Sequence, residues 1–269
     1  MANLGAYSDK ILDKLISGFQ EQIIRIRNIE KHSKIAVFDM DGTLLDGDLE
    51  EAVYCFLIAN NYPVKLKWSN YLEMLDREDY QNAYIALKKG LDGIKADAIM
   101  NFAEKLLSSK HSTIFFREGN IEYQYPIPKI NHELYKLLIY LKINEWKIAV
   151  ISASTQVLVR TLAEKFLNLS TNYIRGTRSE FFVTEDCEDI FTDRITGIIT
   201  YGQGKIDSFK EMFFDEKPMI SAGDSEGDIE LLNYTHKDGF VITCGKSQGN
   251  IQKLRNQLDA DLHKVDFMY

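Results

Sequence analysis

The sequence predicts an α/β protein in which parallel strands form the core and a helical segment is inserted after the first strand. Three short apolar runs, at 35–38, 147–151 and 218–222, each lead directly into polar residues, as buried strands do where they meet a loop. Residues 50–124 carry helical patterns and no strand of this kind. We therefore expect a Rossmann-like core with an inserted helical cap domain, and a ligand site beyond the carboxyl ends of the strands.

Apolar spacing also fixes the expected elements and domain limits. The core covers 1–49 and 125–269, with 1–33 as an N-terminal helical extension, and the cap covers 50–124. Helical periodicity predicts helices at 8–29, 51–60, 68–76, 80–89, 96–108, 131–143 and 156–167. Strands are expected at 34–39 and 147–151, with 239–243 as the last core strand. Residues 180–201 alternate as a hairpin does, with Asp193 and Arg194 near its turn.

Composition excludes some classes of function. A net charge of −8 argues against a nucleic-acid partner, which requires clustered Lys and Arg. Cys55, Cys187 and Cys244 form no CxxC pair and predict reduced thiols. No apolar run approaches the ~18 residues of a membrane span, and charged residues interrupt any signal-peptide pattern at the N-terminus. We expect a cytoplasmic protein, without a membrane partner, that is a monomer or a homodimer.

The stretch Asp39-Met40-Asp41-Gly42-Thr43 is the most informative, because it follows the first apolar run directly. Two carboxylates that lie two residues apart at a strand end point the same way, which places a nucleophile beside a proton donor. Gly42 lets the backbone turn and approach a ligand, and Thr43 adds a hydroxyl. A strand followed by a plain Asp-Gly turn is the structural alternative.

Three further elements follow in order along the chain. The second apolar run ends in Ser152-Ala153-Ser154-Thr155, Lys205 comes just after Gly202-Gln203-Gly204, and the third run leads into Gly223-Asp224-Ser225-Glu226-Gly227-Asp228. Together the four elements resemble the motifs of the haloacid dehalogenase-like (HAD) hydrolase superfamily, Asp-x-Asp-x-Thr, Ser/Thr, Lys and Gly-Asp-x-x-x-Asp, over residues 34–245. The inserted helices and the Ile195-Thr196-Gly197-Ile198 hairpin sequence are most similar to the phosphoserine-phosphatase-like branch, subfamily IB.

The resemblance implies a phosphatase that hydrolyses a small phosphomonoester metabolite through an aspartyl-phosphate. Asp39 would be the nucleophile, Asp41 the general acid and base, and Ser152 and Lys205 would contact the phosphoryl group. The substrate-binding set is Gly42, Thr43, Asp48, Ser152, Ala153 and Lys205. Ser154 is expected to cap the helix that follows it.

Mg²⁺ is the expected cofactor, because two carboxylates facing a phosphate dianion would repel it without a cation. By resemblance its ligands are the Asp39 carboxylate, the Asp41 backbone carbonyl and the Asp224 carboxylate. Asp228, four residues after Asp224, would not bind the ion directly but would support its ligands.

The substrate itself stays open at this stage. Asp48 either contacts a substrate amine or caps the first cap helix. Residues 80–91 contain no arginine to hold a carboxylate, which argues against phosphoserine. The cap aromatics either pack between helices or form a wall for an organic or quaternary-ammonium phosphate: Tyr54, Phe56, Tyr62, Trp68, Tyr71, Tyr80 and Tyr84.

Two other functions use the same residues. A phosphotransferase or phosphomutase would pass the phosphoryl group to an alcohol instead of water. A non-catalytic phosphate-binding protein would need no general acid, so the presence of both Asp39 and Asp41 argues against it.

Overall fold

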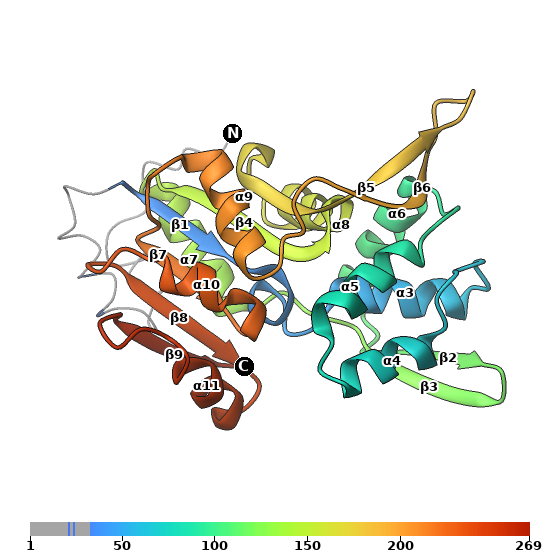
Figure 1. Cartoon of the computed structure of the whole chain (residues 1–269), viewed down its shortest axis with the longest axis horizontal. Coiled ribbons are helices and arrows are strands. Elements are labelled where there is room, and N and C mark those ends of the chain that lie inside the picture. The colour runs from blue at the N-terminus through green and yellow to red at the C-terminus, as the bar shows by residue number, and fades with distance from the viewer. Residues whose placement is uncertain (1–20, 22–23, 25–32) are drawn as a thin grey trace.

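The computed structural model describes Glu21, Ile24 and residues 33–269 (Figure 1). The helix predicted over 8–29 and the extension over 1–33 otherwise lie outside the described residues. Among the helices of the described residues, none combines the length and the apolar character needed to cross a bilayer.

Seven strands of the described residues form one sheet, and six of them run parallel. Only β6 is antiparallel to its neighbour. The strands lie in the order β6 (Asp189–Thr196), β5 (Ile174–Val183), β4 (Lys147–Thr155), β1 (Ile35–Phe38), β7 (Ile220–Gly223), β8 (Phe240–Gly245) and β9 (Lys264–Met268).

The strand order creates a crevice at one point of the sheet. From β5 to β9 the parallel strands follow the doubly wound order 3-2-1-4-5-6 when numbered along the chain. The winding reverses between β1 and β7, which are direct neighbours. Ligands of such sheets bind beyond the carboxyl ends of the strands at this reversal.

Helices cover both faces of the sheet, which explains the uninterrupted apolar runs of the sequence. On one face Phe38 and Val150 belong to the same buried cluster as apolar residues of α7 (His132–Ile143) and α8 (Gln156–Thr161). On the other face Val37 packs with residues of α9 (Gln203–Phe213) and α10 (Ile229–Asn233). The short helix α11 (Gln248–Arg255) covers β8.

The inserted segment lies beside the core and contains the four helices that the sequence predicts (Figure 1). They are α3 (Leu49–Ala59), α4 (Trp68–Asp76), α5 (Tyr80–Lys89) and α6 (Ala96–Leu107). The prediction missed an antiparallel hairpin made of β2 (Thr113–Glu118) and β3 (Ile121–Pro126). The limits of the cap as a separate domain stay a prediction.

The two connections between core and insert are hydrogen-bonded to each other. Leu45 and Ile130 pair as an antiparallel bridge, and the Asn131 N–H donates to the carbonyl of Leu44 at 2.9 Å. The Asn131 side chain also donates to the carbonyl of Thr43 at 3.2 Å. The insert is therefore anchored directly next to the first motif.

The hairpin predicted over 180–201 is present, but its turn was placed wrongly. It begins at Ile174, and its turn lies between Val183 and Asp189, so that Asp193 and Arg194 are within β6. Cross-strand pairing of Phe181 with Phe191 sets this register, because those rings pack on each other with centroids 4.8 Å apart.

Two acidic residues, Glu185 and Asp186, lie in this turn. Glu188 forms an ion pair with Lys95 of the insert at 2.7 Å, and Asp189 begins β6. The hairpin thus reaches across from the core to the insert, where Gly93 N–H also donates to the carbonyl of Phe191.

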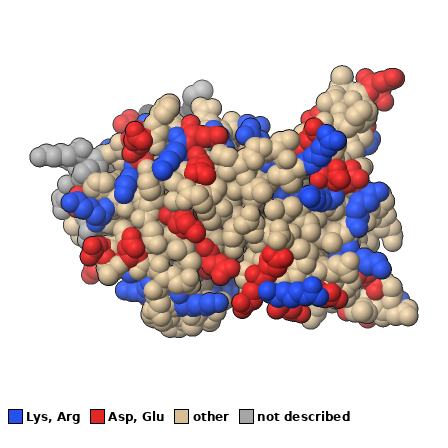
Figure 2. Space-filling model, viewed as in Figure 1, with Lys and Arg blue, Asp and Glu red and all other residues tan. Residues whose placement is uncertain are grey.

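The strand at 239–243 is not the last core strand, because β9 follows it and pairs with β8. β9 is an edge strand with Lys264 and Asp266 among its residues, so its sequence lacks the apolar run that marks the central strands. On the face shown in Figure 2, the described acidic and basic side chains are interspersed over core and insert.

A buried ion pair within the insert is hydrogen-bonded to the core. Lys88 of α5 lies 2.7 Å from the Glu50 carboxylate of α3, and both side chains are almost fully buried. The other Glu50 oxygen accepts hydrogen bonds from the backbone N–H and the hydroxyl of Thr155, at the end of β4. The three residues come from three elements, so the pair holds α3 and α5 against the end of the sheet.

Replacing Lys88 by methionine removes the cation and leaves the Glu50 carboxylate buried. We expect Lys88→Met to lower the free energy of unfolding by about 3 kcal/mol, measured by urea denaturation. Lys89→Met is the matched control at an exposed neighbour, and it should change this free energy by less than ~0.5 kcal/mol. Equal losses for the two variants would contradict the role assigned to the pair.

Candidate active site

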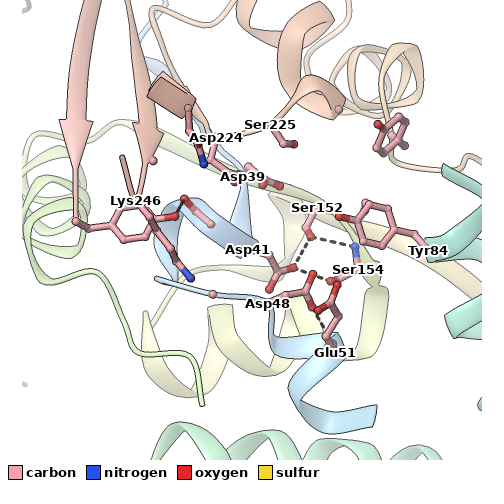
Figure 3. A pocket seen from close by; sticks show the side chains of 18 of the residues that line it. Asp39, Asp41, Asp48, Glu51, Tyr84, Ser152, Ser154, Asp224, Ser225 and Lys246 are labelled. Atoms are coloured by element: carbon pink, nitrogen blue, oxygen red, sulfur yellow. Dashed lines mark hydrogen bonds between the residues drawn. The ribbon is translucent and has the colours of Figure 1, made fainter. Parts of the chain in front are cut away.

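The ends of β1, β4 and β7 bring the four motifs together around one cavity of about 280 Å³ (Figure 3). Asp39 follows β1, Ser152 lies near the end of β4, and Asp224 follows β7. Lys205 comes from the first turn of α9. Asp41 lines the same cavity, so residues separated by more than 180 positions in the chain meet at the reversal of the sheet.

Lys205 is the cation at the centre of this arrangement. Its ammonium lies 2.7 Å from Asp39 Oδ1 and also donates to Asp228 Oδ1. Lys205 is 2 % exposed. Burial lowers its pKa, but the charges of Asp228 and Asp39 outweigh this effect and raise the pKa above its ordinary value. Lys205 therefore stays charged.

Asp228 supports both the cation and the loop that carries Asp224. Its Oδ1 binds Lys205, while its Oδ2 accepts from the Ser225 N–H and the Ser225 hydroxyl at 3.1 Å. The same oxygen accepts from the Asp224 N–H at 3.2 Å. Asp228 thereby orders the start of the short helix at 226–228 and fixes the backbone beside Asp224.

Three carboxylates form a cluster that fits a hard divalent cation. One oxygen each from Asp39, Asp224 and Asp228 lies within 4.8 Å of the others. Burial, followed by the charge of Asp228, raises the pKa of Asp39 to about 8. The pKa of Asp224 is raised by burial and by both neighbouring carboxylates. Carboxylate oxygens are ligands that Mg²⁺ and similar ions prefer. Such an ion would also supply the positive charge that compensates the three carboxylates.

Asp41 has a different environment from Asp39. Its Oδ1 accepts from the Leu49 N–H at 2.8 Å, and its Oδ2 accepts from the hydroxyls of Ser154 at 2.6 Å and Ser152 at 3.2 Å. Burial raises the pKa of Asp41 to about 6, and these three hydrogen bonds act in the opposite direction. The Asp41 carboxyl is thus held by neutral hydrogen-bond donors and forms no direct ion pair.

Ser154 does not cap the following helix as the sequence suggested. The residue before α8 is Thr155, and the Ser154 hydroxyl points to Asp41 instead. The difference arises because β4 continues through Thr155, four residues beyond the predicted strand. In an extended strand, residues 152 and 154 face the same side. That spacing was the signal in the sequence for a second serine at the site.

Gly42 lies where no other residue fits. Its φ is +69°, and a Cβ there would lie 2.1 Å from Asp224 Oδ2. Its carbonyl accepts a hydrogen bond from the Tyr269 hydroxyl at 2.6 Å. Thr43 is fully buried behind the cavity and donates to Asp224 Oδ1 at 3.4 Å. Gly42 and Thr43 both belong to the predicted substrate-binding set, but of these two only Gly42 lines the cavity.

The two alternatives for Asp48 are compatible with each other. Its carboxylate accepts from the Glu51 N–H at 2.8 Å and so caps α3. Asp48 also lines the cavity, as does the predicted Ala153. Sequence reasoning missed several lining residues that come from distant elements: Glu51, Tyr125, Tyr201, Lys246 and Tyr269.

Comparison with known proteins gives the family. The sequence model of haloacid dehalogenase-like hydrolases matches residues 36–233. The chain therefore belongs to this family, and the resemblance drawn from its motifs is confirmed. No curated protein matches the chain.

Solved structures show the same fold at low identity. A conserved protein of unknown function from Anaerococcus prevotii is 16 % identical with a TM-score of 0.62, over 90 % of each chain. A phosphoserine phosphohydrolase-like protein from Francisella tularensis is 16 % identical with a TM-score of 0.56, over 86 % of this chain and 94 % of that one. A substrate-bound phosphoserine phosphatase is 14 % identical with a TM-score of 0.54, over 88 % and 94 %.

A methyl group at Gly42 should disrupt the cluster, because it adds a clash with Asp224 to the cost of a positive φ. We expect Gly42→Ala to lower the free energy of unfolding by more than ~2 kcal/mol and to abolish stabilisation by Mg²⁺ in thermal unfolding. Gly93→Ala is the matched control, since Gly93 also has a positive φ but nothing within 4 Å of the added carbon. If both variants respond equally to Mg²⁺, the contact with Asp224 does not matter.

Proposed function

We propose that this protein is a Mg²⁺-dependent phosphatase that hydrolyses a small phosphomonoester through an aspartyl-phosphate on Asp39. The observation that carries the proposal is the convergence of Asp39, Asp41, Lys205 and Asp224 on one small cavity. Family membership and the fold shared with phosphoserine phosphatases support it. The cavity volume lies just below the usual range for drug-sized ligands, which favours a small metabolite.

In the first step a carboxylate oxygen of Asp39 attacks phosphorus. Lys205 binds Oδ1, which leaves Oδ2 as the attacking atom. The bond from phosphorus to the ester oxygen breaks, and Asp41 donates its proton to the departing alkoxide. Ser152 lies beside Asp41 and is placed to donate to a phosphoryl oxygen once the substrate is bound.

In the second step Asp41 takes a proton from water, and the resulting hydroxide attacks phosphorus. The bond between phosphorus and Asp39 breaks, which releases inorganic phosphate and restores both carboxyl groups to their starting states. The Leu49 N–H and the Ser154 hydroxyl hold Asp41 in place throughout.

The residues of the cluster would have different roles in binding the ion. Asp39, Asp224 and the backbone carbonyl of Asp41 would be its ligands, and Asp228 would hold Lys205 and the Asp224 loop in position. When bound, Mg²⁺ neutralises the charge of the carboxylates and of the phosphoryl oxygens.

Substitutions of the two aspartates of the first motif should have different effects. Asp39→Asn should reduce phosphate release to background. Asp41→Asn should lower kcat by about 10²–10⁴ and, with p-nitrophenyl phosphate, should accumulate phosphoenzyme. A phenolate needs little protonation to leave, but the water step still lacks its base. Mass spectrometry of the acid-quenched protein measures the phosphoenzyme.

Asp207→Asn, at an exposed position of α9, is the control and should keep full activity. Unchanged turnover in Asp39→Asn would overturn the mechanism. Faster phosphoryl transfer to an added alcohol than to water would replace the phosphatase by a phosphotransferase.

Removal of the metal should stop the reaction. We expect dialysis against EDTA to abolish phosphate release and Mg²⁺ to restore it. Asp224→Asn should raise the Mg²⁺ concentration for half-maximal activity at least tenfold, because it removes one charged ligand. Full activity in EDTA, or an unchanged Mg²⁺ requirement in the variant, would remove the ion from the proposal.

A further inference from the structure

The wall of the cavity contributed by the insert is acidic and aromatic. Asp48 and Glu51 stand at the start of α3, next to Asp41, and Tyr84 of α5 points into the same space (Figure 3). Tyr125, at the end of the β2–β3 hairpin, completes this wall. These residues face the part of a substrate that leaves with the ester oxygen.

Glu51 is held in place as a hydrogen-bond acceptor. Its Oε1 accepts from the Tyr71 hydroxyl at 2.5 Å, and its Oε2 accepts from the Tyr125 hydroxyl at 2.6 Å. Such distances are typical of a hydroxyl that donates to an ionised carboxylate. Burial raises the pKa of Glu51 overall, and the two phenols and the charge of Lys246 act in the opposite direction. A cation beside Glu51 would favour the charged form further.

Among the described residues that line the cavity, none forms an ion pair with Glu51, although the charge of Lys246 lowers the pKa of Glu51 from a distance. Only two of them are basic, Lys205 and Lys246, and none is an arginine. Lys205 is bound to Asp39 and Asp228 at the other end. Lys246 is exposed, in the turn after β8. Glu51 has two neutral hydrogen-bond donors but no ion pair, so this end of the cavity is complementary to a positively charged ligand group.

The two ends of the cavity are close enough for one small molecule to span them. The pKa of Tyr84 is raised first by burial, then by Asp48 and Glu51 from the insert and by Asp224 and Asp41 from the core. Asp39 and Glu51 also line the same cavity of about 280 Å³, which is small enough for one molecule to contact both. Aromatic rings such as those of Tyr84 and Tyr125 attract cations, and the Lys88 ammonium lies 5.9 Å from the centroid of the Tyr84 ring.

From this geometry we infer that the organic part of the substrate is a small cation without a carboxylate, an amine or a quaternary ammonium, bound by Glu51 between Tyr84 and Tyr125. The inference rests on the proposed phosphatase function. A carboxylate on the substrate would meet Asp48 and Glu51 without a guanidinium to pair with it. A neutral alcohol would leave the charge of Glu51 uncompensated.

A pair of esters that differ only in charge tests this inference. Choline phosphate and 3,3-dimethylbutyl phosphate have the same shape, but the second has carbon in place of nitrogen. We expect kcat/KM for choline phosphate or ethanolamine phosphate to exceed that for the neutral ester by at least ~30-fold. Phosphoserine should fall below ethanolamine phosphate. Equal values for the charged and neutral esters would overturn the inference while leaving the phosphatase intact.

Variants identify the residue that recognises the positive charge of the substrate. Glu51→Gln should reduce the ratio of kcat/KM for the cationic and neutral esters by about tenfold or more, mostly through KM for the cation. Glu73→Gln makes the same change at an exposed position of α4 and should keep the ratio of the unmodified protein. An unchanged ratio in Glu51→Gln would remove Glu51 from the inference.

A binding measurement separates this inference from the phosphatase itself. Calorimetry with Asp39→Asn and Mg²⁺ compares the affinities of choline phosphate and 3,3-dimethylbutyl phosphate without turnover. Tighter binding of the cation supports the inference even if no ester is hydrolysed, an outcome that overturns only the proposed function. Equal or weaker binding of the cation overturns the inference.

Discussion

The balance of buried charge around Asp39 is the constraint on which the rest of this structure depends. Asp39, Asp224 and Asp228 share one small volume with a single ammonium, that of Lys205. The two aspartates of the first motif are chemically identical, yet one is paired with a cation and the other with neutral donors. The charge of Lys205 favours the ionised form of Asp39 against burial and the charge of Asp228, whereas only hydrogen bonds from neutral groups favour the ionised form of Asp41. Environment, more than residue type, assigns their roles.

Sheet topology and the insert together produce that environment. The adjacency of β1 and β7 brings the first and last motifs side by side, and the winding reversal leaves room above them. The insert then closes this space with its own backbone, since the Leu49 N–H that holds Asp41 is in the first turn of α3. Glu50, the next residue, binds the end of β4. Movement of the insert would therefore change the donors around Asp41, so its position and the chemistry are coupled.

The sequence predicted those elements and site residues that a single local pattern identifies. It did not predict those that depend on contacts between distant elements. Strand β1 and the motif after it were predictable, because a strand buried on both faces is apolar throughout and Asp-x-Asp has a strand spacing. The β2–β3 hairpin and β9 escaped prediction because one face of each is exposed and carries polar residues. No local sequence pattern marks Glu51, because its position in the site depends on hydrogen bonds from Tyr71 and Tyr125, which are distant in the sequence.

The same charge balance orients a ligand along the cavity. In the proposed reaction Lys205 and a bound cation would attract the phosphoryl group at one end, and Glu51 and Asp48 would repel it at the other. A molecule that is negative at one end and positive at the other has one favourable direction in this field, with phosphorus toward Asp39. Reversed binding would place phosphate against Glu51 and an ammonium against Lys205. Orientation is part of catalysis, so Asp48 and Glu51 would contribute to the rate of the proposed reaction as well as to the choice of substrate.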